Sequence, residues 1–218
     1  MENNPWFNIR PNDYDAHMSH PNVKQTQILN RIIKEQLELI PASVRPASKA
    51  AILGITNGNG LEHVVSCNVG HIIGIDINPA FLDECRTRFP DLTGRLSLYQ
   101  MDLTTEMTES VTVLSECDLI IANLIIEHIH LNNFVKIMKG LSKHGQIVSC
   151  VIQVNPDSIV ASKSGIEQLF DDIVKYTEEE NITTLDRVMQ NSGYFVNGKT
   201  VYDLPNSKQL IQSNYTTV

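Results

Sequence analysis

Short runs of consecutive apolar residues alternate along this chain with segments whose apolar residues recur at helical spacing. The apolar runs, rich in Ile, Leu and Val, predict strands at residues 50–54, 71–76, 96–101, 118–123 and 146–154. Helical spacing predicts helices at residues 23–40, 60–67, 79–89, 108–114 and 127–139. Near-continuous apolar runs are typical of parallel strands buried on both faces. The chain therefore predicts an α/β fold with a Rossmann-like, doubly wound, mostly parallel sheet.

The two ends of the chain depart from this alternation. Residues 166–176 and 184–191 predict helices, and residues 194–202 and 208–215 predict strands rich in Tyr, Val and Thr. Pro205 and Asn206 mark a turn between these strands, so we expect a C-terminal antiparallel pair that closes the sheet. The first twenty residues are rich in Asn, Pro and His and are expected to be irregular.

A glycine-rich turn follows the first predicted strand. Residues 51–64 read AILGITNGNGLEHV, which predicts a strand, a turn and a helix start, and the next strand ends on Asp76. Such a unit points backbone N–H groups at a ligand and places an acid where a ribose would lie. Asp76 comes 22 positions after Gly54, close to the spacing of about 20 in nucleoside sites. The pattern predicts an adenosine-containing cofactor.

Composition narrows the classes of partner. The chain has 218 residues, 42% of them hydrophobic and 19% charged, and a formal net charge of −8. An acidic chain without a Lys/Arg run disfavours nucleic acid as a partner. The four cysteines form no Cys-x-x-Cys pair, and His17 and His20 lack a third partner at metal spacing, so neither a metal site nor a disulfide framework is expected. No signal peptide or membrane span is evident, and we predict a cytoplasmic protein.

The glycine spacing also allows another enzyme class. Gly54, Gly58 and Gly60 match the Gly-x-x-x-Gly-x-Gly turn of short-chain dehydrogenases, which motivates an NAD(P)-dependent reductase as an alternative. Those enzymes need a tyrosine whose pKa is lowered by a lysine four residues later. The sequence contains no Tyr-x-x-x-Lys, so this alternative lacks its acid.

From about residue 14 to its end, the chain resembles class I S-adenosylmethionine-dependent methyltransferases. Their first strand and turn read acidic-x-Gly-x-Gly-x-Gly, where residues 52–58 here read ILGITNG. The outer glycines, Gly54 and Gly58, match, whereas Ile52 replaces the acid and Thr56 replaces the middle glycine. The resemblance implies a class I methyltransferase fold with S-adenosylmethionine as cofactor. The two departures motivate a further alternative, a non-catalytic relative that binds the cofactor weakly.

The resemblance also implies roles for particular residues. An acid at the position of Asp76 holds the ribose hydroxyls, and one at Asp102 lies against the adenine amino group. Residues 117–129 resemble the fourth strand and the loop beside the transferable methyl, where His128 is the candidate base for an oxygen nucleophile, next to Glu127. The expected cofactor contacts are Gly54, Thr56, Gly58, Asp76, Ile77, Asp102, Leu103, Asn123, Tyr14 and His17.

Taken together, these patterns predict an enzyme that methylates an unidentified small molecule. Residues 123–126 read NLII, not the Asn-Pro-Pro-Tyr type used on nucleic-acid bases, and we expect neither a nucleic-acid nor a membrane partner. We expect a single domain over residues 1–218. It would comprise an N-terminal lid and helix (1–45), a cofactor-binding core (46–155), and substrate-side helices with the strand pair (156–218). The sequence does not indicate the oligomeric state.

Overall fold

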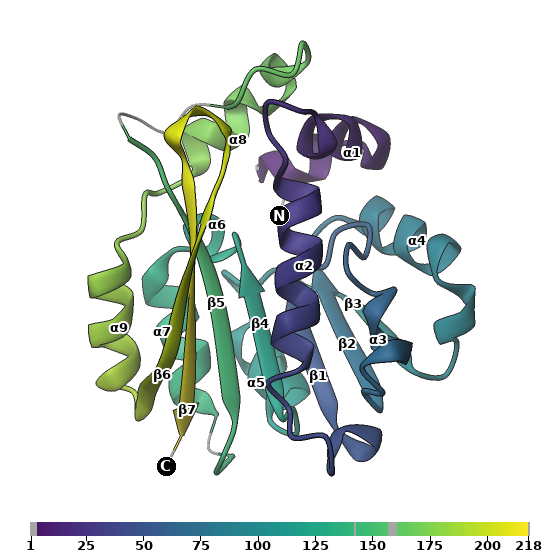
Figure 1. Cartoon of the computed structure of the whole chain (residues 1–218), viewed down its shortest axis with the longest axis vertical. Coiled ribbons are helices and arrows are strands. Elements are labelled where there is room, and N and C mark those ends of the chain that lie inside the picture. Colours follow the sequence, from purple (N-terminus) through teal and green to yellow (C-terminus); the bar gives the residue numbers. More distant parts are fainter. Residues whose placement is uncertain (1–3, 142, 157–160, 218) are drawn as a thin grey trace.

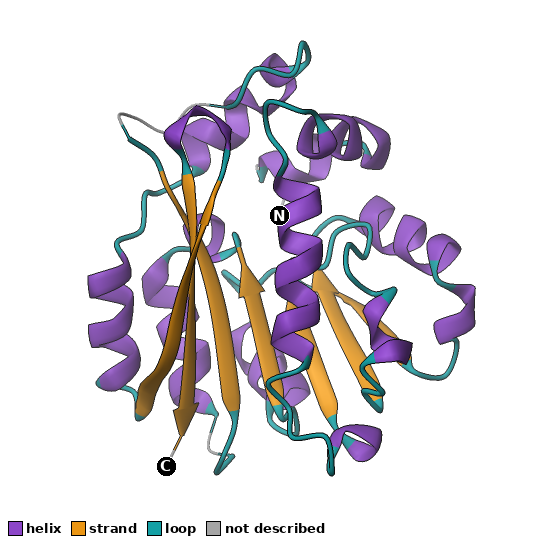
Figure 2. Cartoon of the chain, in the orientation of Figure 1, coloured by secondary structure: helices purple, strands orange, loops and turns teal. Residues whose placement is uncertain are grey.

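One seven-stranded sheet forms the centre of the computed structural model, which describes residues 4–141, 143–156 and 161–217. Its strands are β1 (Lys49–Leu53), β2 (His71–Asp76), β3 (Leu96–Gln100), β4 (Leu119–Asn123), β5 (Ile147–Val154), β6 (Tyr194–Asp203) and β7 (Gln209–Thr217). Their order is β3-β2-β1-β4-β5-β7-β6 (Figures 1 and 2). The first five strands pair in parallel, and β7 pairs antiparallel with β5 and β6. The predicted doubly wound sheet with its C-terminal antiparallel pair is confirmed. Residues 157–160 and 218 of the predicted substrate-side part lie outside the described residues.

Helices cover both faces of the sheet. The helices α2 (Gln25–Leu37), α3 (His63–Ser66) and α4 (Pro79–Arg88) pack on one face, and α5 (Met107–Leu114), α7 (Leu131–Gly140) and α9 (Ile182–Gln190) pack on the other. Successive strand residues point to opposite faces of the sheet. Ile52 therefore packs in the apolar layer under α2, α3 and α4, and Leu53 packs in the layer under α5, α7 and α9. This two-sided burial explains why the strands are almost continuously apolar.

A small cap lies over the carboxyl ends of the parallel strands (Figure 1). It consists of η1 (Pro5–Asn8), α1 (Pro11–Ser19), η4 (Glu167–Phe170) and α8 (Asp171–Tyr176). Ile9, Phe170 and Ile173 join it to Phe81 of α4 in a separate apolar cluster. The cap thus brings the N-terminal segment and the segment after β5 together above the sheet.

The prediction that the first twenty residues are irregular is wrong. Helix α1 begins with Pro11 in its first turn and carries Asp13 there, both of which favour a helix start. The residues of α1 that line the cavity below the cap, Tyr14, His17 and Met18, include no Ile, Leu or Val. Periodicity of aliphatic residues therefore gives no signal for this helix.

Three predicted helices also have different bounds. The helix expected at residues 127–139 is two helices, α6 (Ile126–Ile129) and α7, because His130 adopts a positive φ of 65° between them. The helix expected at residues 60–67 is reduced to α3, and the one at 166–176 starts as the 3-10 turn η4. The break at His130 makes α6 a separate short turn after β4. The remaining short turns are η2 (Arg45–Ala47), η3 (Pro90–Leu92) and η5 (Pro205–Ser207).

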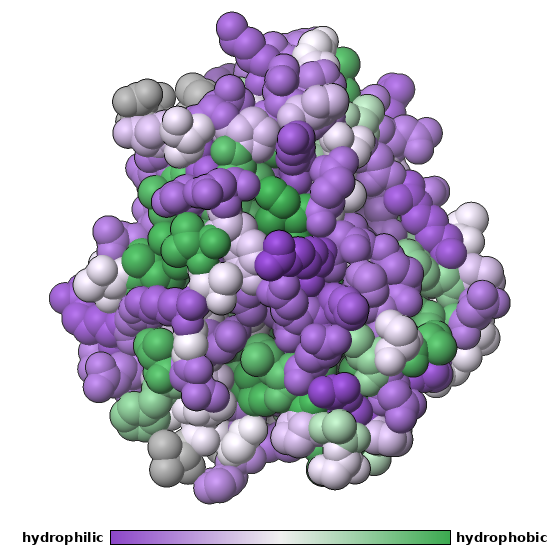
Figure 3. All heavy atoms as spheres, viewed as in Figure 1, coloured by the Kyte–Doolittle hydropathy of each residue, from purple (hydrophilic) through white to green (hydrophobic). Residues whose placement is uncertain are grey.

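The molecular surface is mixed. Hydrophilic residues predominate on the face shown in Figure 3, and hydrophobic side chains are visible between the cap and the sheet. Among the described residues, no helix is both long and apolar enough to cross a membrane. Cys67, Cys85, Cys117 and Cys150 are free thiols buried in the core.

Candidate active site

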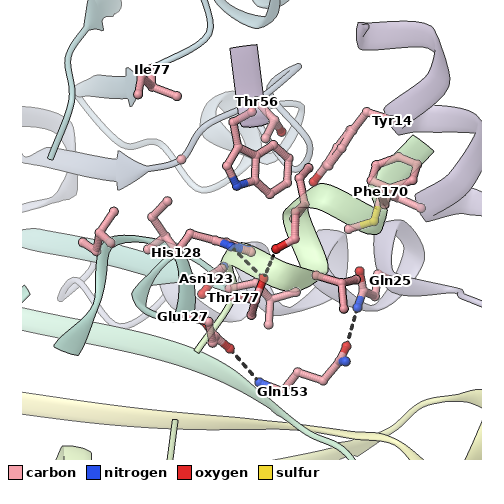
Figure 4. Close-up of a pocket in the computed structure, with 18 of the residues that line it drawn as sticks. Tyr14, Gln25, Thr56, Ile77, Asn123, Glu127, His128, Gln153, Phe170 and Thr177 are labelled. Atoms are coloured by element: carbon pink, nitrogen blue, oxygen red, sulfur yellow. Dashed lines mark hydrogen bonds between the residues drawn. The ribbon is translucent and has the colours of Figure 1, made fainter. Parts of the chain in front are cut away.

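A cavity of about 210 Å³ lies between the cap and the carboxyl ends of the parallel strands (Figure 4). It sits where the strand order reverses between β1 and β4, the position at which open α/β sheets bind ligands. All predicted site residues except Gly58 line it: Tyr14, His17, Gly54, Thr56, Asp76, Ile77, Asp102, Leu103, Asn123, Glu127 and His128. Segments far apart in the sequence therefore meet at one place.

Gly58 packs closely against neighbouring side chains. Its φ is +83°, and a Cβ there would lie 2.7 Å from Cε2 of Phe89 and 2.8 Å from Sγ of Cys85. It borders a smaller hollow beside the cavity. The glycine is needed because the turn packs tightly against α4 and the residue that follows it.

Asp76 joins the glycine-rich turn to the start of α4. Its Oδ2 accepts the N–H of Thr56 and its Oδ1 accepts the N–H of Asn78, both at 2.9 Å. The side chain is buried, and this burial raises the pKa of Asp76 to about 6 despite these hydrogen bonds. Each carboxylate oxygen has a second lone pair. Asp76 can therefore accept two further hydroxyl donors from a ligand in the cavity.

Thr56 occupies a backbone conformation that suits glycine. Its φ is +49°, an unfavourable region for a β-branched residue. Its N–H faces Asp76, so the strained conformation keeps this donor in place. The position corresponds to the middle glycine of the methyltransferase motif, so the sequence departs from the motif while the backbone keeps a glycine-like conformation.

We expect Thr56→Gly to leave the free energy of unfolding unchanged or to raise it by up to about 1 kcal/mol. Relief of the left-handed strain, on the order of 1–2 kcal/mol, offsets the greater backbone entropy of glycine in the unfolded chain. Urea unfolding measures the change. Thr200→Gly, at an exposed position of β6, is the control and should lose up to about 1 kcal/mol. An equal loss at both positions would show that Thr56 is not strained.

Asp102 is held by its own turn. Its Oδ1 accepts the N–H of Thr104 at 2.9 Å and the Thr104 hydroxyl at 2.6 Å. Its Oδ2 accepts no hydrogen bond from any described residue. Asp102 lines the cavity, as do its neighbours in the sequence, Met101 and Leu103. Asp102 thus keeps one carboxylate oxygen for an N–H donor of a ligand.

The side chain of Asn123 is already engaged. Its amide exchanges two hydrogen bonds of 2.8 Å with the amide of Gln36 on α2, and Gln36 also donates to Ser149 at 2.9 Å. This network ties β4 to α2 at the edge of the cavity. Asn123 therefore positions the strand end, and its side-chain amide keeps one N–H and one oxygen lone pair for a ligand.

His128 lines the cavity and contacts Thr177 at the end of α8. The Thr177 hydroxyl donates to the carbonyl of Ile173 at 2.8 Å and lies 3.2 Å from Nδ1 of His128. A hydroxyl has one hydrogen, so Nδ1 carries the proton and donates to Thr177, leaving the lone pair on Nε2. Desolvation by the surrounding protein, with a smaller contribution from His130, lowers the pKa of His128 to about 4. The ring is thus neutral near pH 7, as a base must be.

Glu127 is buried beside His128. Its Oε1 accepts the N–H of Gln153 at 3.0 Å, whereas its Oε2 is buried and has no hydrogen-bond partner among the described residues. Burial raises the pKa of Glu127 to about 7, against the effect of the Gln153 hydrogen bond. A side chain with an unpaired buried oxygen at a cavity wall is a candidate ligand contact.

Tyr14 and His17 bring the cap to the cavity. Nδ1 of His17 lies 2.7 Å from Oγ of Ser164, and its ring stacks on Phe170 at 4.2 Å. Burial lowers the pKa of His17. Tyr14 packs edge-on against Phe81 at 5.3 Å. These contacts join α1 to the segment before α8, so both parts of the cap close over the cavity together.

Other lining residues were not predicted from the sequence. They include Trp6 and, labelled in Figure 4, Gln25, Gln153, Phe170 and Thr177. Gln153 lies near the end of β5, and the rule that ligands bind at the carboxyl ends of strands could have identified it. Gln25 and Thr177 carry no comparable signal, because tertiary packing alone brings them to the cavity. Among the described residues, no group of three or more His, Cys, Asp or Glu could hold a metal ion.

Comparison with known proteins establishes the fold. No family model matches the sequence, and no curated protein matches it. An O-methyltransferase family protein from Burkholderia thailandensis superposes with a TM-score of 0.61 at 14% identity, over 95% of this chain and 63% of its own. The chain has the class I methyltransferase fold. The match covers 63% of the Burkholderia protein, so this chain spans less than two thirds of the length of that protein.

Two further solved methyltransferases share this fold and were crystallised with cofactor or product. Magnesium protoporphyrin IX methyltransferase from Synechocystis, with bound S-adenosylmethionine, has a TM-score of 0.62 at 8% identity over 88% of this chain and 79% of its own. Geranyl diphosphate C-methyltransferase from Streptomyces coelicolor, with S-adenosylhomocysteine, has a TM-score of 0.63 at 11% identity, over 88% and 78%. None of these structures supports the reductase alternative.

Proposed function

We propose that this chain is an S-adenosylmethionine-dependent methyltransferase that acts on a small molecule. The observation that carries the proposal is Asp76, which ends β2 in the cavity of a methyltransferase fold and keeps lone pairs on both oxygens. Similar folds hold S-adenosylmethionine or S-adenosylhomocysteine in their crystals. The acidic net charge of −8 favours a small molecule over nucleic acid as substrate.

The lining residues suit the parts of this cofactor. Asp76 would accept both ribose hydroxyls, and the remaining oxygen of Asp102 would accept the adenine amino group. Ile77 and Leu103 would provide apolar walls for the base. The backbone at Gly54 and Thr56 would approach the methionine part. We further propose that residues 1–45 act as lid and helix, residues 46–155 hold the cofactor, and residues 156–218 shape the substrate end.

In this proposal the protein acts mainly by positioning the substrate and the cofactor relative to each other. Bound S-adenosylmethionine supplies a methyl group on a cationic sulfur, and the electron pair of the broken C–S bond stays on sulfur. The cap excludes water and holds the substrate in line with the methyl group. Nε2 of His128 accepts the proton that an oxygen nucleophile loses, while Thr177 fixes the tautomer. Glu127 contacts the substrate beside it.

A non-catalytic relative is the second candidate, because two motif positions differ. Ile52 is 4% exposed and packs within the apolar layer below α2, so it cannot replace the acid of the family motif. Thr56 places a side chain where the motif has none. This candidate predicts weak or no binding of S-adenosylhomocysteine and no turnover in a broad metabolite screen, whereas our proposal predicts binding and turnover.

We expect Asp76→Asn to weaken binding of S-adenosylhomocysteine by about 1–3 kcal/mol, the range for hydrogen bonds to a charged group. An amide can accept from one hydroxyl but not from two. Asparagine is preferable to alanine because Asp76 is buried and accepts two backbone N–H groups, one of which the amide oxygen can keep. Isothermal titration calorimetry measures the affinity.

The exposed acid Asp91, replaced by asparagine, controls for net charge. Circular dichroism checks that the variant at position 76 is folded. Affinity in the unsubstituted protein should also fall as the pH drops below about 6, where Asp76 takes up a proton. A folded Asp76→Asn variant with unchanged affinity would contradict the ribose role.

A further inference from the structure

The unpaired carboxylate of Glu127 indicates what kind of substrate the cavity selects. Its side chain is 6% exposed, and Gln153 donates to Oε1 only. Oε2 is buried and has no partner among the described residues. A buried acceptor without a donor is costly, and it is relieved when a ligand supplies an N–H or O–H group. Among such donors, a cation gains most because its hydrogen bond is charge-assisted.

The charges around the cavity favour a cation at this position. Acidic side chains at its wall outnumber basic ones: Asp76, Asp102, Glu127, Glu178 and Glu179 against Lys208, among the described lining residues. Glu178 donates its N–H to the carbonyl of Glu127 at 3.0 Å, so this acidic segment runs beside α6. Both imidazoles in the cavity, His17 and His128, have lowered pKa values and add no positive charge near pH 7.

Aromatic side chains also line the cavity. Trp6 contacts His128 edge-on at 5.0 Å, and its indole Nε1 is buried without a partner among the described residues. Tyr14 and Phe170 line the same cavity (Figure 4). Flat apolar walls accept an aromatic ring, and their π faces attract cations. The walls and the carboxylate together fit an arylalkylamine better than a neutral or anionic molecule of the same shape.

We propose that the substrate presents a protonated amine to Oε2 of Glu127 and that the enzyme therefore selects cationic small molecules. This proposal rests on the proposed methyltransferase function. It specifies the group that anchors the substrate, whichever atom of the substrate accepts the methyl group.

Calorimetric titration of three probes with one ring system tests the proposal. Tryptamine is a cation, tryptophol is neutral and indole-3-acetate is an anion. Each is titrated into the protein with and without saturating S-adenosylhomocysteine. We expect tryptamine to bind at least about tenfold more tightly than tryptophol, as expected for a charge-assisted hydrogen bond in a buried site.

Two matched variants separate the effect of the Glu127 carboxylate from that of the negative charge around the cavity as a whole. We expect Glu127→Gln to weaken tryptamine at least about tenfold and to change tryptophol less than about twofold. Glu179→Gln removes the same charge at an exposed position of the cavity rim, and solvent screening should keep its effect on tryptamine below about twofold. The titrations are done at pH 8, above the pKa of about 7 that burial gives Glu127, so that the two replacements differ in burial and not in charge.

Three results would overturn the proposal: no binding of tryptamine, equal or tighter binding of tryptophol or indole-3-acetate, or an unchanged affinity for tryptamine in Glu127→Gln. The S-adenosylhomocysteine titration is scored separately. If that molecule binds and the amine preference is absent, the proposed function stands and the cation site fails. If the amine preference is present and S-adenosylhomocysteine does not bind, the cation site stands and the methyltransferase proposal fails.

Discussion

Replacing His128 with alanine is expected to lower turnover at least about 100-fold and to leave the affinity for S-adenosylhomocysteine nearly unchanged. The expected loss is that of a general base, for a substrate whose nucleophile must lose a proton. Nε2 of His128 is the acceptor because Thr177 fixes the proton on Nδ1. Initial rates with an authentic substrate, followed by release of S-adenosylhomocysteine, measure the effect.

The pH profile distinguishes a base from a structural histidine. Because burial lowers the pKa of His128 to about 4, the neutral ring persists from neutral pH down to about pH 5, and the contribution of the base is lost below about pH 4. Thr177→Val should reduce turnover less than His128→Ala does, since it frees the tautomer without removing the ring. His144→Ala, at an exposed position, is the control. Full turnover in His128→Ala would exclude the base role.

Glu127→Gln is expected to stabilise the folded protein at pH 8 by up to about 3 kcal/mol and to have little effect at pH 4.5. Burial raises the pKa of Glu127 to about 7, from its ordinary value of about 4.5. The folded state therefore holds a proton that the unfolded state releases between these two values. The free energy of unfolding of the unsubstituted protein therefore falls as the pH rises through this window, by up to about 1.4 kcal/mol per pH unit.

Urea unfolding at both pH values measures this dependence. Asp76 also has a raised pKa, but it is present in both proteins and cancels in the comparison. Glu179→Gln, which is exposed, should show no such difference between pH 4.5 and pH 8. If Glu127→Gln destabilises the protein at pH 8 as much as at pH 4.5, the carboxyl is not buried in the way described. Retained stability also ensures that lost binding by this variant does not reflect unfolding.

The central sheet was predictable because its signal is local. Ile72, Ile75 and Ile120 belong to strands buried on both faces, so an uninterrupted apolar run marks each strand. Asp76 was predictable for a related reason, since it ends the buried apolar run of β2. Asp102 follows β3, whose residues are only partly buried or exposed, and it was predictable from the resemblance to methyltransferases. The carboxyl ends of parallel strands meet at one edge of the sheet, which brings these acids to the cavity without knowledge of the loops.

The cap was less predictable because tertiary contacts define it. Helix α1 is held by His17 against Phe170 and Ser164, about 150 positions away in sequence, and no periodicity reports such a contact. The break at His130 depends on a positive φ that its residue type does not require. Gly58 shows that glycine spacing alone does not separate close packing from ligand approach, since a Cβ at this position would meet Phe89 and Cys85.

Calorimetric titration of the unsubstituted protein with S-adenosylhomocysteine and, separately, with NADPH tests the central claim most directly. We expect saturable one-to-one binding of S-adenosylhomocysteine that Asp76→Asn weakens about 5- to 150-fold, with no heat from NADPH. Saturable binding of NADPH together with no binding of S-adenosylhomocysteine would contradict that claim.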